Sequence, residues 1–393
     1  MSFPFRRTYS WRRCLKTGHD FDERMMSEAL RLARKGEGCV SPNPLIGAVI
    51  VKNGEIVGRG YHRRIGGPHA EVVALEQAGD RASHSTLYVN LEPCCHQGRT
   101  PPCTDAIIKA GVGRVVAAMQ DPNPLVNGAG FKRLRAAGIT VEKGCLQHKA
   151  RDLNEAFFVH VTKGRPFLIA KVAMSLDGKL ATASGESKWI TSQMARHFSY
   201  KIRHHVDGIM VGLNTVLADD PELSRRLNRS GPQRPFSRII LDTSLRTPPW
   251  ARILKSARVH PVLIVCGKKP IERRRRALEA KGAVVIPCKE REGRVDFVAA
   301  CFELGRRGIS SIVVEGGADL LGTAFDNRLV DKVVIFIAPK IIGGERAPSP
   351  VAGEGARGIS DAIPVANVKW IRAGADMIAI GRPDYSKLNR ATP

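Results

Sequence analysis

The sequence is poor in aromatic residues, and it has few acidic residues for the number of basic ones. Aromatic side chains make up 6% of the 393 residues, and 62 Lys and Arg stand against 37 Asp and Glu, a formal net charge of +25. Such a charge attracts anionic partners, nucleic acids among them. However, the basic residues are spread over both halves, and aromatic platforms for stacked bases are scarce. We therefore expect no nucleic-acid partner, and interpret the charge as a basic solvated surface or an attraction to phosphorylated small molecules.

The sequence also lacks a long apolar run and a paired set of cysteines. No apolar run approaches the roughly 18 residues of a membrane span, so we expect no membrane partner. Nine cysteines, an odd number, are scattered along a chain without a secretory signal, which indicates reduced thiols and a cytoplasmic location. Five basic residues and no acid lie within residues 1–16. We interpret 1–21 as a basic N-terminal tail in preference to an organelle transit peptide.

Length and periodicity predict two α/β domains. A chain of 393 residues exceeds one ordinary core. Between residues 22 and 141 helical and strand patterns alternate, as in a three-layer α/β/α domain. Lys163-Gly164-Arg165-Pro166 then breaks the pattern. We predict a first domain over 22–160 and a second α/β domain over 165–385.

Local patterns predict the individual elements. Apolar residues recur at helical spacing from Met26 to Ala33, with Asp22 as a candidate N-cap. Asn53-Gly54 separates two apolar runs and predicts a β-hairpin over 46–57. Further strands are predicted at 86–91, 113–119 and 139–141, and in the second domain at 167–174, 208–211, 238–241, 262–265, 283–286, 311–314 and 332–337.

Two short motifs bring together the side chains of a hydrolytic zinc site. One is Pro68-His69-Ala70-Glu71, and the other runs from Pro93-Cys94 to Cys103. A His-x-Glu followed by Pro-Cys and a second Cys is typical of zinc deaminases, in which the Glu carries protons and is no ligand. Three protein ligands leave the fourth zinc position open for water, whose pKa then falls toward neutrality. We predict that His69, Cys94 and Cys103 hold one Zn2+ and that Glu71 is the catalytic proton carrier.

A closed structural zinc site is the alternative. Cys95 and His96 are both candidates for a fourth ligand, and a zinc-stabilised binding module without catalysis would need such a shell. Glu71, two residues after a ligand histidine, has no purpose in a structural site. We therefore favour the catalytic interpretation.

The gap between the two cysteines is longer than in most deaminases. Eight residues separate Cys94 from Cys103, where Pro-Cys-x-x-Cys leaves two. The insert carries His96 and Arg99, which are donors that suit a phosphate, and His62 is a further candidate. The gap therefore favours a phosphorylated substrate over a free nucleoside or RNA, the rival deaminase substrates.

Glycine patterns in the second half are weaker signals. Gly316-Gly317 follows a predicted strand and precedes an apolar helix, a turn at which backbone N–H groups can approach a pyrophosphate. A plain strand-to-helix connector explains the same turn. A formal G-x-G-x-x-G at Gly353, Gly355 and Gly358 follows no predicted strand, so we interpret it as a loop.

Taken together, the motifs resemble the bifunctional deaminase-reductase family of riboflavin biosynthesis over residues 22–344. The first half shares that family's motifs at 42–44, 60–62, 69–71, 93–103 and 121–124, and the second half shares those at 171–178, 185–191, 214–221 and 314–317. Two positions depart from the family pattern: Cys95 stands where Ser is common, and Ala129 where a basic residue is usual. Neither belongs to the predicted ligand set.

The resemblance implies a fold and two activities. The expected fold is a cytidine-deaminase-like three-layer α/β/α domain followed by a dihydrofolate-reductase-like α/β domain. The expected reactions are zinc-dependent deamination of 2,5-diamino-6-(5-phosphoribosylamino)pyrimidin-4(3H)-one and NADPH-dependent reduction of 5-amino-6-(5-phosphoribosylamino)uracil to its ribitylamino phosphate. A second half that is degenerate and kept only for dimerisation is the alternative. We also expect a homo-oligomer held through the reductase domain.

The resemblance also implies residue roles. In the deaminase, Asn43 would contact the pyrimidine, with His62, His96 and Arg99 near the ribose phosphate. Lys171 would assist proton transfer in the reductase or form a structural ion pair. The other reductase substrate contacts would be Ser187, Arg203, Leu223, Arg226 and Glu315. The cofactor contacts would be Ala173, Trp189, Thr215, Asp219, Thr243, Gly317, Ala318, Asp319, Leu320, Leu321, Gly322 and Thr323.

Overall fold

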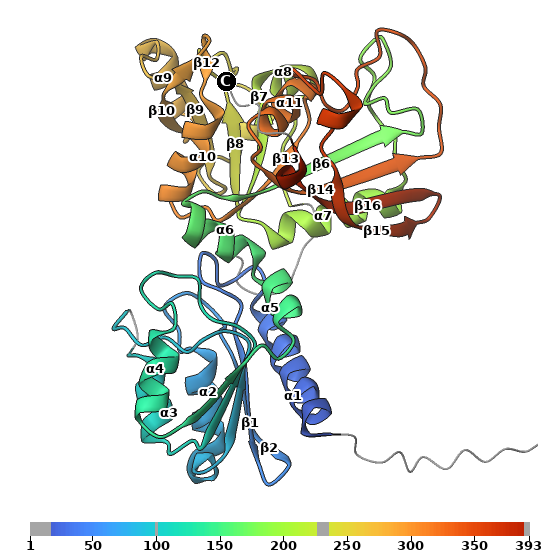
Figure 1. The fold of residues 1–393 in the computed structure, drawn as a ribbon. Helices are drawn as coiled ribbons and strands as arrows, with labels where there is room; N and C mark the ends of the chain where they lie inside the picture. The colour runs from blue at the N-terminus through green and yellow to red at the C-terminus, as the bar shows by residue number, and fades with distance from the viewer. Residues whose placement is uncertain (1–16, 99–100, 226–235, 389–393) are drawn as a thin grey trace, which may run out of the picture. The chain divides into compact units, whose positions relative to one another are not determined.

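A computed structural model of the chain describes residues 17–98, 101–225 and 236–388, and the chain forms two compact units. The first unit comprises Met1–Gly36 and Leu45–Leu153, and the second comprises Glu37–Pro44 and Asn154–Pro393. Each unit contains its own sheet (Figure 1). Within the described ranges, no helix has both the length and the apolar character needed to cross a bilayer.

The first unit is built on a five-stranded sheet in the order β2-β1-β3-β4-β5. β1 runs antiparallel to β2 and β3, whereas β3, β4 and β5 are parallel. The predicted hairpin is confirmed, with Asn53 and Gly54 at φ values of 51° and 82° between β1 and β2. The strand bounds are β1 Gly47–Lys52, β2 Glu55–Tyr61, β3 Thr86–Val89, β4 Arg114–Ala117 and β5 Thr140–Lys143.

Helices cover both faces of this sheet. A Cβ atom at Gly47 would lie 2.0 Å from the Ala29 carbonyl oxygen, and one at Gly60, on the opposite face, 2.0 Å from that of Ala70. The helices α1 and α2 therefore pack against opposite faces of the sheet, each at a position where only glycine fits. The predicted three-layer arrangement is confirmed (Figure 1). The helix bounds are α1 Thr17–Ala33, α2 Ala70–Ala78, α3 Cys103–Lys109, α4 Ala129–Ala136 and α5 Gln147–Leu153.

The prediction that Asp22 caps the first helix is wrong. α1 already begins at Thr17, so Asp22 lies inside it. Its carboxylate instead accepts hydrogen bonds from Arg114 at 2.6 and 3.1 Å. A long-range ion pair thus explains an acidic residue that the local pattern placed at a helix start.

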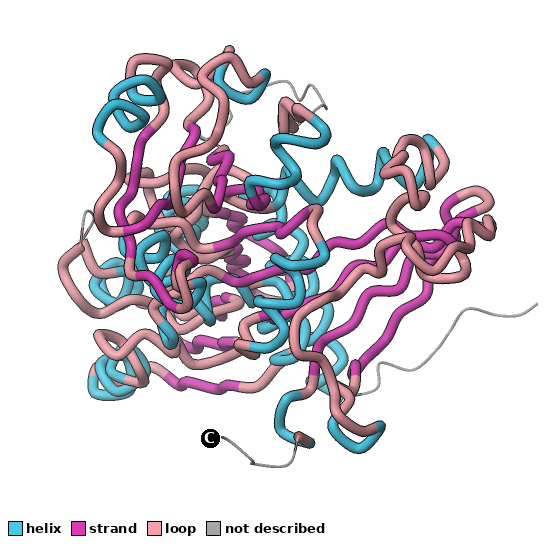
Figure 2. The backbone as a smooth tube through the Cα atoms, turned by 90° about the horizontal axis from the view of Figure 1, so that it is seen from above, coloured by secondary structure: helices cyan, strands magenta, loops and turns pink. Residues whose placement is uncertain are grey.

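The second unit is built on a nine-stranded sheet in the order β10-β9-β8-β7-β13-β6-β14-β16-β15. The seven strands from β10 to β14 are parallel to their neighbours, and β16 and β15 add an antiparallel hairpin at one edge. Figures 1 and 2 show β6, β14, β16 and β15 as long strands that lie side by side. The strand bounds are β6 Phe167–Ser175, β7 Gly208–Gly212, β8 Ser237–Leu241, β9 Val262–Gly267, β10 Val284–Cys288, β11 Glu290–Arg291, β12 Arg294–Val295, β13 Ser311–Glu315, β14 Val330–Ala338, β15 Val365–Ala373 and β16 Asp376–Pro383.

Both faces of the parallel part are buried. Ile312 and Val314 of β13 belong to one apolar core, and Val313 between them belongs to another. A continuous apolar run is typical of a parallel strand with helices on both sides. The helix bounds are α6 Glu155–Lys163, α7 Gln193–His205, α8 Leu213–Asp219, α9 Glu272–Glu279, α10 Phe297–Arg306 and α11 Ala318–Asp326.

The seven strands predicted in the second half are confirmed, but the β15–β16 hairpin was missed. Along β15 nearly every residue is exposed, including Trp370 and Val368, so neither face shows an apolar alternation. The glycines at 353, 355 and 358 lie between β14 and β15, and no strand directly precedes them, as predicted.

Candidate active sites

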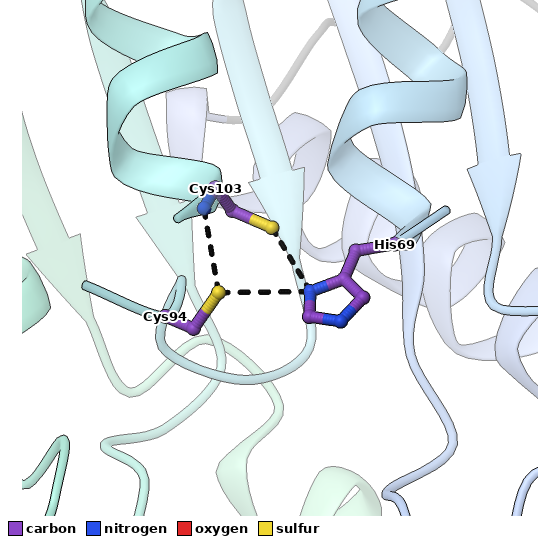
Figure 3. Close-up of side chains that lie close together, drawn as sticks. All are labelled: His69, Cys94 and Cys103. Carbon is purple, nitrogen blue, oxygen red and sulfur yellow. Dashed lines mark hydrogen bonds between the residues drawn. The ribbon is translucent and has the colours of Figure 1, made fainter. Parts of the chain in front are cut away.

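Three elements of the first unit bring His69, Cys94 and Cys103 together (Figure 3). His69 is the N-cap of α2, Cys103 is the first residue of α3, and Cys94 lies in the turn after β3. His69 Nδ1 lies 3.1 Å from Cys103 Sγ and 3.6 Å from Cys94 Sγ, and all donor atoms lie within 4.8 Å of one another. Ligand atoms of tetrahedral zinc are roughly 3.5 Å apart, so the three donors fit one zinc ion.

The two thiols of this group differ in acidity. Hydrogen bonds from the Cys103 thiol, from His69 and from the Cys103 backbone N–H outweigh burial and lower the pKa of Cys94 to about 4. The hydrogen bond to Cys94 and burial raise the pKa of Cys103. A zinc ion would bind both cysteines as thiolates, so its binding would release any proton that they carry.

Glu71 lies in the first turn of α2, and 4% of its surface is exposed. Burial raises the pKa of its carboxyl group, and its Oε2 is buried without a hydrogen-bond partner among the described residues. A buried acceptor without a partner is rare in folded proteins and is explained most simply by a group that binds there. Glu71 therefore has the environment of a proton carrier.

The metal group has three possible protein ligands among the described residues. Among the described residues, the cluster of possible ligands contains His69, Cys94 and Cys103, and neither Cys95 nor His96 joins it. A closed four-ligand shell is therefore not formed. Three ligands with a free fourth position are typical of catalytic zinc and not of structural zinc.

The other predicted deaminase residues occupy different surroundings. His62 is buried, its Nδ1 lies 3.1 Å from the Pro68 carbonyl oxygen, and burial lowers its pKa. His96 Nδ1 is buried without a partner in the described part of the chain. Asn43 belongs to Glu37–Pro44, which groups with the second unit through a 2.8 Å hydrogen bond from Ser41 Oγ to Asp207. Arg99 lies outside the described residues.

In the second unit, Arg203 and Glu315 form a buried ion pair. Arg203 donates two hydrogen bonds, at 3.0 and 2.9 Å, to the two carboxylate oxygens of Glu315, and a third, at 2.7 Å, to the Ser224 carbonyl. Lys171, opposite Glu315 in the β6–β13 register, lies 3.7 Å from it. The charges of Arg203 and Lys171 outweigh burial and lower the pKa of Glu315 to about 2. The predicted substrate residues Arg203, Glu315 and Lys171 therefore lie in one charged cluster.

The carboxyl ends of neighbouring strands carry several predicted cofactor residues. Gly316 and Gly317 follow β13 with φ values of 75° and 71°, and α11 begins directly after them. A Cβ at Gly316 would lie 3.1 Å from Thr215 of α8, which follows β7. Thr243 follows β8. In open α/β sheets ligands bind at this edge. Backbone N–H groups at a helix start can donate hydrogen bonds to a pyrophosphate there. The arrangement fits a dinucleotide.

The remaining predicted reductase residues lie on several elements. Ala173 is in β6, and Ser187 and Trp189 are in the segment before α7. Trp189 is 60% exposed and stacks against Arg196 at 4.3 Å. Asp219 is exposed at the end of α8, and Leu223 is buried beside Ser224 with a φ of 55°. Arg226 lies outside the described residues.

Sequence reasoning missed Glu92, a buried carboxylate two residues before Cys94. Its hydrogen-bond partners are backbone groups of residues 121–131. No side-chain motif reveals such partners, since only the fold brings them to Glu92.

Two protein families match the chain, one in each half. Residues 19–119 match the cytidine and deoxycytidylate deaminase zinc-binding region, and residues 166–379 match the RibD C-terminal domain. The first match contains His69, Cys94 and Cys103, and the second contains the Arg203–Glu315 cluster.

Relatives match both halves at once. The riboflavin biosynthesis protein RibD of Actinobacillus pleuropneumoniae is 43% identical over 348 residues, which cover 88% of this chain and 91% of the relative. RibD of Escherichia coli is 44% identical over 334 residues, covering 82% and 89%. The structure of Acinetobacter baumannii RibD superposes with a TM-score of 0.83 at 33% identity, covering 93% of this chain and 99% of that one. A Thermotoga maritima diaminohydroxyphosphoribosylaminopyrimidine deaminase/5-amino-6-(5-phosphoribosylamino)uracil reductase superposes with a TM-score of 0.81 at 33% identity, covering 94% and 100%.

Proposed function

Because the chain belongs to the RibD family of riboflavin biosynthesis, we propose that its two sites act in succession on one phosphorylated pyrimidine. The chain is a bifunctional deaminase and reductase of that pathway. We assign the deaminase to residues 22–160 and the reductase to residues 165–385. The observation that carries the proposal is the group of three possible ligands, together with a buried Glu71 oxygen that has no partner among the described residues, in the same chain as the Arg203–Glu315 cluster.

The first reaction is the hydrolytic deamination of 2,5-diamino-6-(5-phosphoribosylamino)pyrimidin-4(3H)-one. His69, Cys94 and Cys103 would hold one zinc ion, which lowers the pKa of a bound water so that it can attack near neutral pH. Glu71 takes a proton from the nucleophile and delivers it to the departing ammonia. Its raised pKa suits this role. A group that must both take up and release a proton works best when its pKa lies close to the operating pH.

The second reaction is the reduction of 5-amino-6-(5-phosphoribosylamino)uracil to its ribitylamino phosphate, with NADPH as the hydride donor. Gly317 and the first residues of α11, Ala318 to Thr323, would hold the cofactor together with Ala173, Trp189, Thr215, Asp219 and Thr243. Glu315 holds Arg203 in place, and Lys171 beside them can supply the proton that ring opening of the ribose requires. Ser187, Leu223 and Arg226 would complete the substrate site.

Residues of the Cys94–Cys103 insert would recognise the substrate phosphate. His96 supports this assignment because its Nδ1 is buried without a partner among the described residues. Arg99 and His62 are assigned by resemblance to the same phosphate, and Asn43 to the pyrimidine. A phosphate bound by imidazole and guanidinium groups gains charge-assisted hydrogen bonds.

A two-step assay tests the proposed function. The purified protein is supplied with the diaminopyrimidine phosphate, first without NADPH and then with it. We expect ammonia to be released in the first stage and NADPH to be consumed, one per substrate, in the second. Absence of ammonia in the first stage would refute the deaminase assignment, and absence of NADPH consumption in the second would refute the reductase assignment.

A homo-oligomer would cover the exposed edge of the reductase sheet. β15 is the outermost strand and exposes Val365, Val368, Trp370 and Ile371, and Met377 of β16 adds to this surface. An apolar edge strand pairs readily with another chain unless it is covered, so a second copy of this chain is the proposed occupant. Light scattering should show a dimer or larger assembly for the wild type and a monomer for Trp370→Glu. A monomeric wild type would refute this oligomer.

A cytoplasmic location fits the zinc chemistry. Cys94, Cys95 and Cys103 are free thiols, and zinc binding needs two of them reduced. A reducing compartment keeps neighbouring thiols from oxidising. Recovery of both activities in the cytoplasmic fraction of cells would test this location.

A further inference from the structure

Glu92 links the zinc-binding turn to a distant segment of the first unit. The residue follows β3, directly before Pro93-Cys94, and 3% of its surface is exposed. Its Oε2 accepts hydrogen bonds from the backbone N–H groups of Asp121 and Gly128, at 3.1 and 2.9 Å, and its Oε1 accepts one from Phe131 at 3.1 Å. Both carboxylate oxygens are therefore occupied by the segment 121–131.

Two of these bonds cap α4 from outside the helix. Gly128, the N-cap residue of α4, has no side chain to accept hydrogen bonds, and Phe131 lies in the first turn. Glu92 therefore takes the place of the missing cap and adds a negative charge at the positive end of the helix. The helix start also lies close to the next peptide of the turn, because a Cβ at Gly130 would lie 2.2 Å from the Pro93 carbonyl oxygen.

The same turn is held on its other side by α3. The Thr104 N–H donates to the Cys94 carbonyl at 3.1 Å, and the Cys103 N–H donates to Cys94 Sγ at 3.3 Å. Arg133 of α4 also donates to the Cys95 carbonyl at 3.4 Å. The peptide that carries Cys94 therefore lies between the starts of two helices. α3 carries the predicted ligand Cys103, and α4 carries no predicted ligand.

We propose that Glu92 is a positioning residue of the zinc site. By fixing the start of α4 against the Pro93-Cys94 turn, it sets the place of Cys94 Sγ relative to His69 and Cys103. This inference rests on the proposed zinc deaminase function. It adds a residue that touches neither zinc nor substrate and acts through the backbone that carries a ligand.

Replacement by glutamine changes one atom of this arrangement. In Glu92→Gln one oxygen becomes an NH2 group, and either orientation turns a donor toward a backbone N–H that needs an acceptor. The start of α4 then has to shift or lose a hydrogen bond. Groups that orient metal ligands typically change metal affinity by about 10- to 100-fold when they are mutated.

The test measures how firmly zinc is held, apart from catalysis. Zinc-loaded full-length protein is mixed with a chromophoric chelator, and the release rate is compared for the wild type, Glu92→Gln and Leu134→Ala. Leu134 belongs to α4 and packs into the apolar core, so its truncation weakens the packing of that helix and leaves the hydrogen bonds of Glu92 in place. We expect about 10- to 100-fold faster release from Glu92→Gln and near wild-type release from Leu134→Ala.

A second readout and a second variant secure the result. The cobalt-substituted protein should show a shifted thiolate charge-transfer band in Glu92→Gln and an unshifted band in Leu134→Ala. If Glu92→Gln does not fold, Gly130→Ala tests the same link, because its Cβ would lie 2.2 Å from the Pro93 carbonyl oxygen and 3.0 Å from Glu92 Oε1, and so pushes the start of α4 away from both. It should also release zinc faster.

The outcomes separate this inference from the proposed function. If Glu92→Gln releases zinc no faster than Leu134→Ala at a similar loss of thermal stability, Glu92 only caps α4, and the inference is wrong. Wild-type release from a folded Gly130→Ala would overturn it as well. A wild type that holds no zinc would refute the proposed deaminase itself. Circular dichroism and thermal unfolding of each variant show whether the first unit is folded, because reductase activity reports on the second unit alone.

Discussion

The deaminase site and the reductase site differ in how their buried carboxylates are paired. In the first unit, Glu71 Oε2 is buried without a partner in the described ranges, and the donor atoms of His69, Cys94 and Cys103 lie within 4.8 Å of one another. In the second unit, Arg203 occupies both oxygens of Glu315, and Lys171 stands beside the pair. The carboxylate of the first site has an oxygen without a partner in the described part of the chain, whereas both oxygens of the second carboxylate are paired with cationic side chains.

This contrast shows two ways in which a protein can offset the free-energy cost of burying a polar or charged group. A buried polar group without a partner is expensive, and so is a buried charge without a counter-charge. A bound zinc ion would remove the cost at His69, Cys94 and Cys103, which ties the stability of that site to metal. The Arg203–Glu315 pair stabilises the reductase site before any ligand arrives. The two sites should therefore respond differently to mutation and to pH.

The largest expected effect is on the deaminase. Glu71→Gln keeps the shape of the side chain but removes the proton carrier, so the deamination rate should fall by about 10²- to 10⁴-fold. Zinc content should remain one per chain, because Glu71 is not among the ligands. Ammonia release and atomic absorption measure the two quantities, and an unchanged rate of NADPH consumption with 5-amino-6-(5-phosphoribosylamino)uracil supplied directly is the control. Loss of zinc from the folded variant would contradict the claim that Glu71 is no zinc ligand.

The second effect is on the stability of the reductase unit. Glu315→Gln leaves Arg203 and Lys171 without their counter-charge, and breaking a buried ion pair costs about 3–5 kcal/mol. Chemical unfolding followed by tryptophan fluorescence measures the loss, since three of the four tryptophans, Trp189, Trp250 and Trp370, lie in this unit.

A double variant provides the matched control for this prediction. Adding Arg203→Met to Glu315→Gln removes both charges of the close pair, so much of the stability should return. A single Glu315→Gln variant as stable as the wild type would mean that the pair is not a buried ion pair in solution.

A smaller effect is expected for substrate binding at the zinc site. His96→Ala removes a candidate phosphate donor whose Nδ1 is buried without a partner among the described residues. A hydrogen bond to a charged group contributes about 1.5–3 kcal/mol, so the KM of deamination should rise by about 10- to 100-fold with little change in kcat. Steady-state kinetics measure both constants. A fall in kcat at unchanged KM would remove His96 from the phosphate site.

The smallest effect is the pH dependence of the Glu315 pair. Burial is outweighed by Arg203 and Lys171, so the pKa of Glu315 lies at about 2 in the folded chain, below roughly 4.3 in an unfolded one. A lowered pKa contributes stability that is complete above the unfolded value and is lost as pH falls through the folded value. The advantage of the wild type over Glu315→Gln should therefore be constant down to about pH 4 and shrink toward pH 2. Urea titrations at several pH values would test this, and an advantage that shrinks already between pH 7 and 5 would contradict it.

The two sites also differ in how far the sequence could predict them. His69, Glu71, Cys94 and Cys103 lie in two short motifs, so their types and spacing predicted a zinc site, and the structure brings the donor atoms of the three predicted ligands within 4.8 Å of one another. Arg203, Ser224 and Glu315 come from α7, a loop and β13. The family resemblance predicted two of these residues singly, but no local pattern predicted their contact, because it depends on the order of strands in the sheet.

The same reasoning explains the errors in the predicted fold. Buried parallel strands carry apolar runs and were predicted, whereas β15 exposes both faces and was not. Asp22 looked like a helix cap, but its partner Arg114 is 92 residues away in the sequence. Glu92 was overlooked because its partners are backbone groups. Local periodicity therefore predicts elements, and long-range charge pairs remain invisible until the fold is known.

X-ray absorption at the zinc edge tests the central claim most directly, namely that the deaminase site is a three-ligand metal site that its own side chains leave open. The measurement is made on wild type and on Glu71→Gln. The expected first shell contains two sulfur atoms near 2.3 Å, one nitrogen near 2.0 Å and one further light atom from solvent, with the same sulfur count in the variant. Three sulfur atoms, which would bring in Cys95, or a lost light atom in Glu71→Gln, which would make Glu71 a ligand, would contradict it.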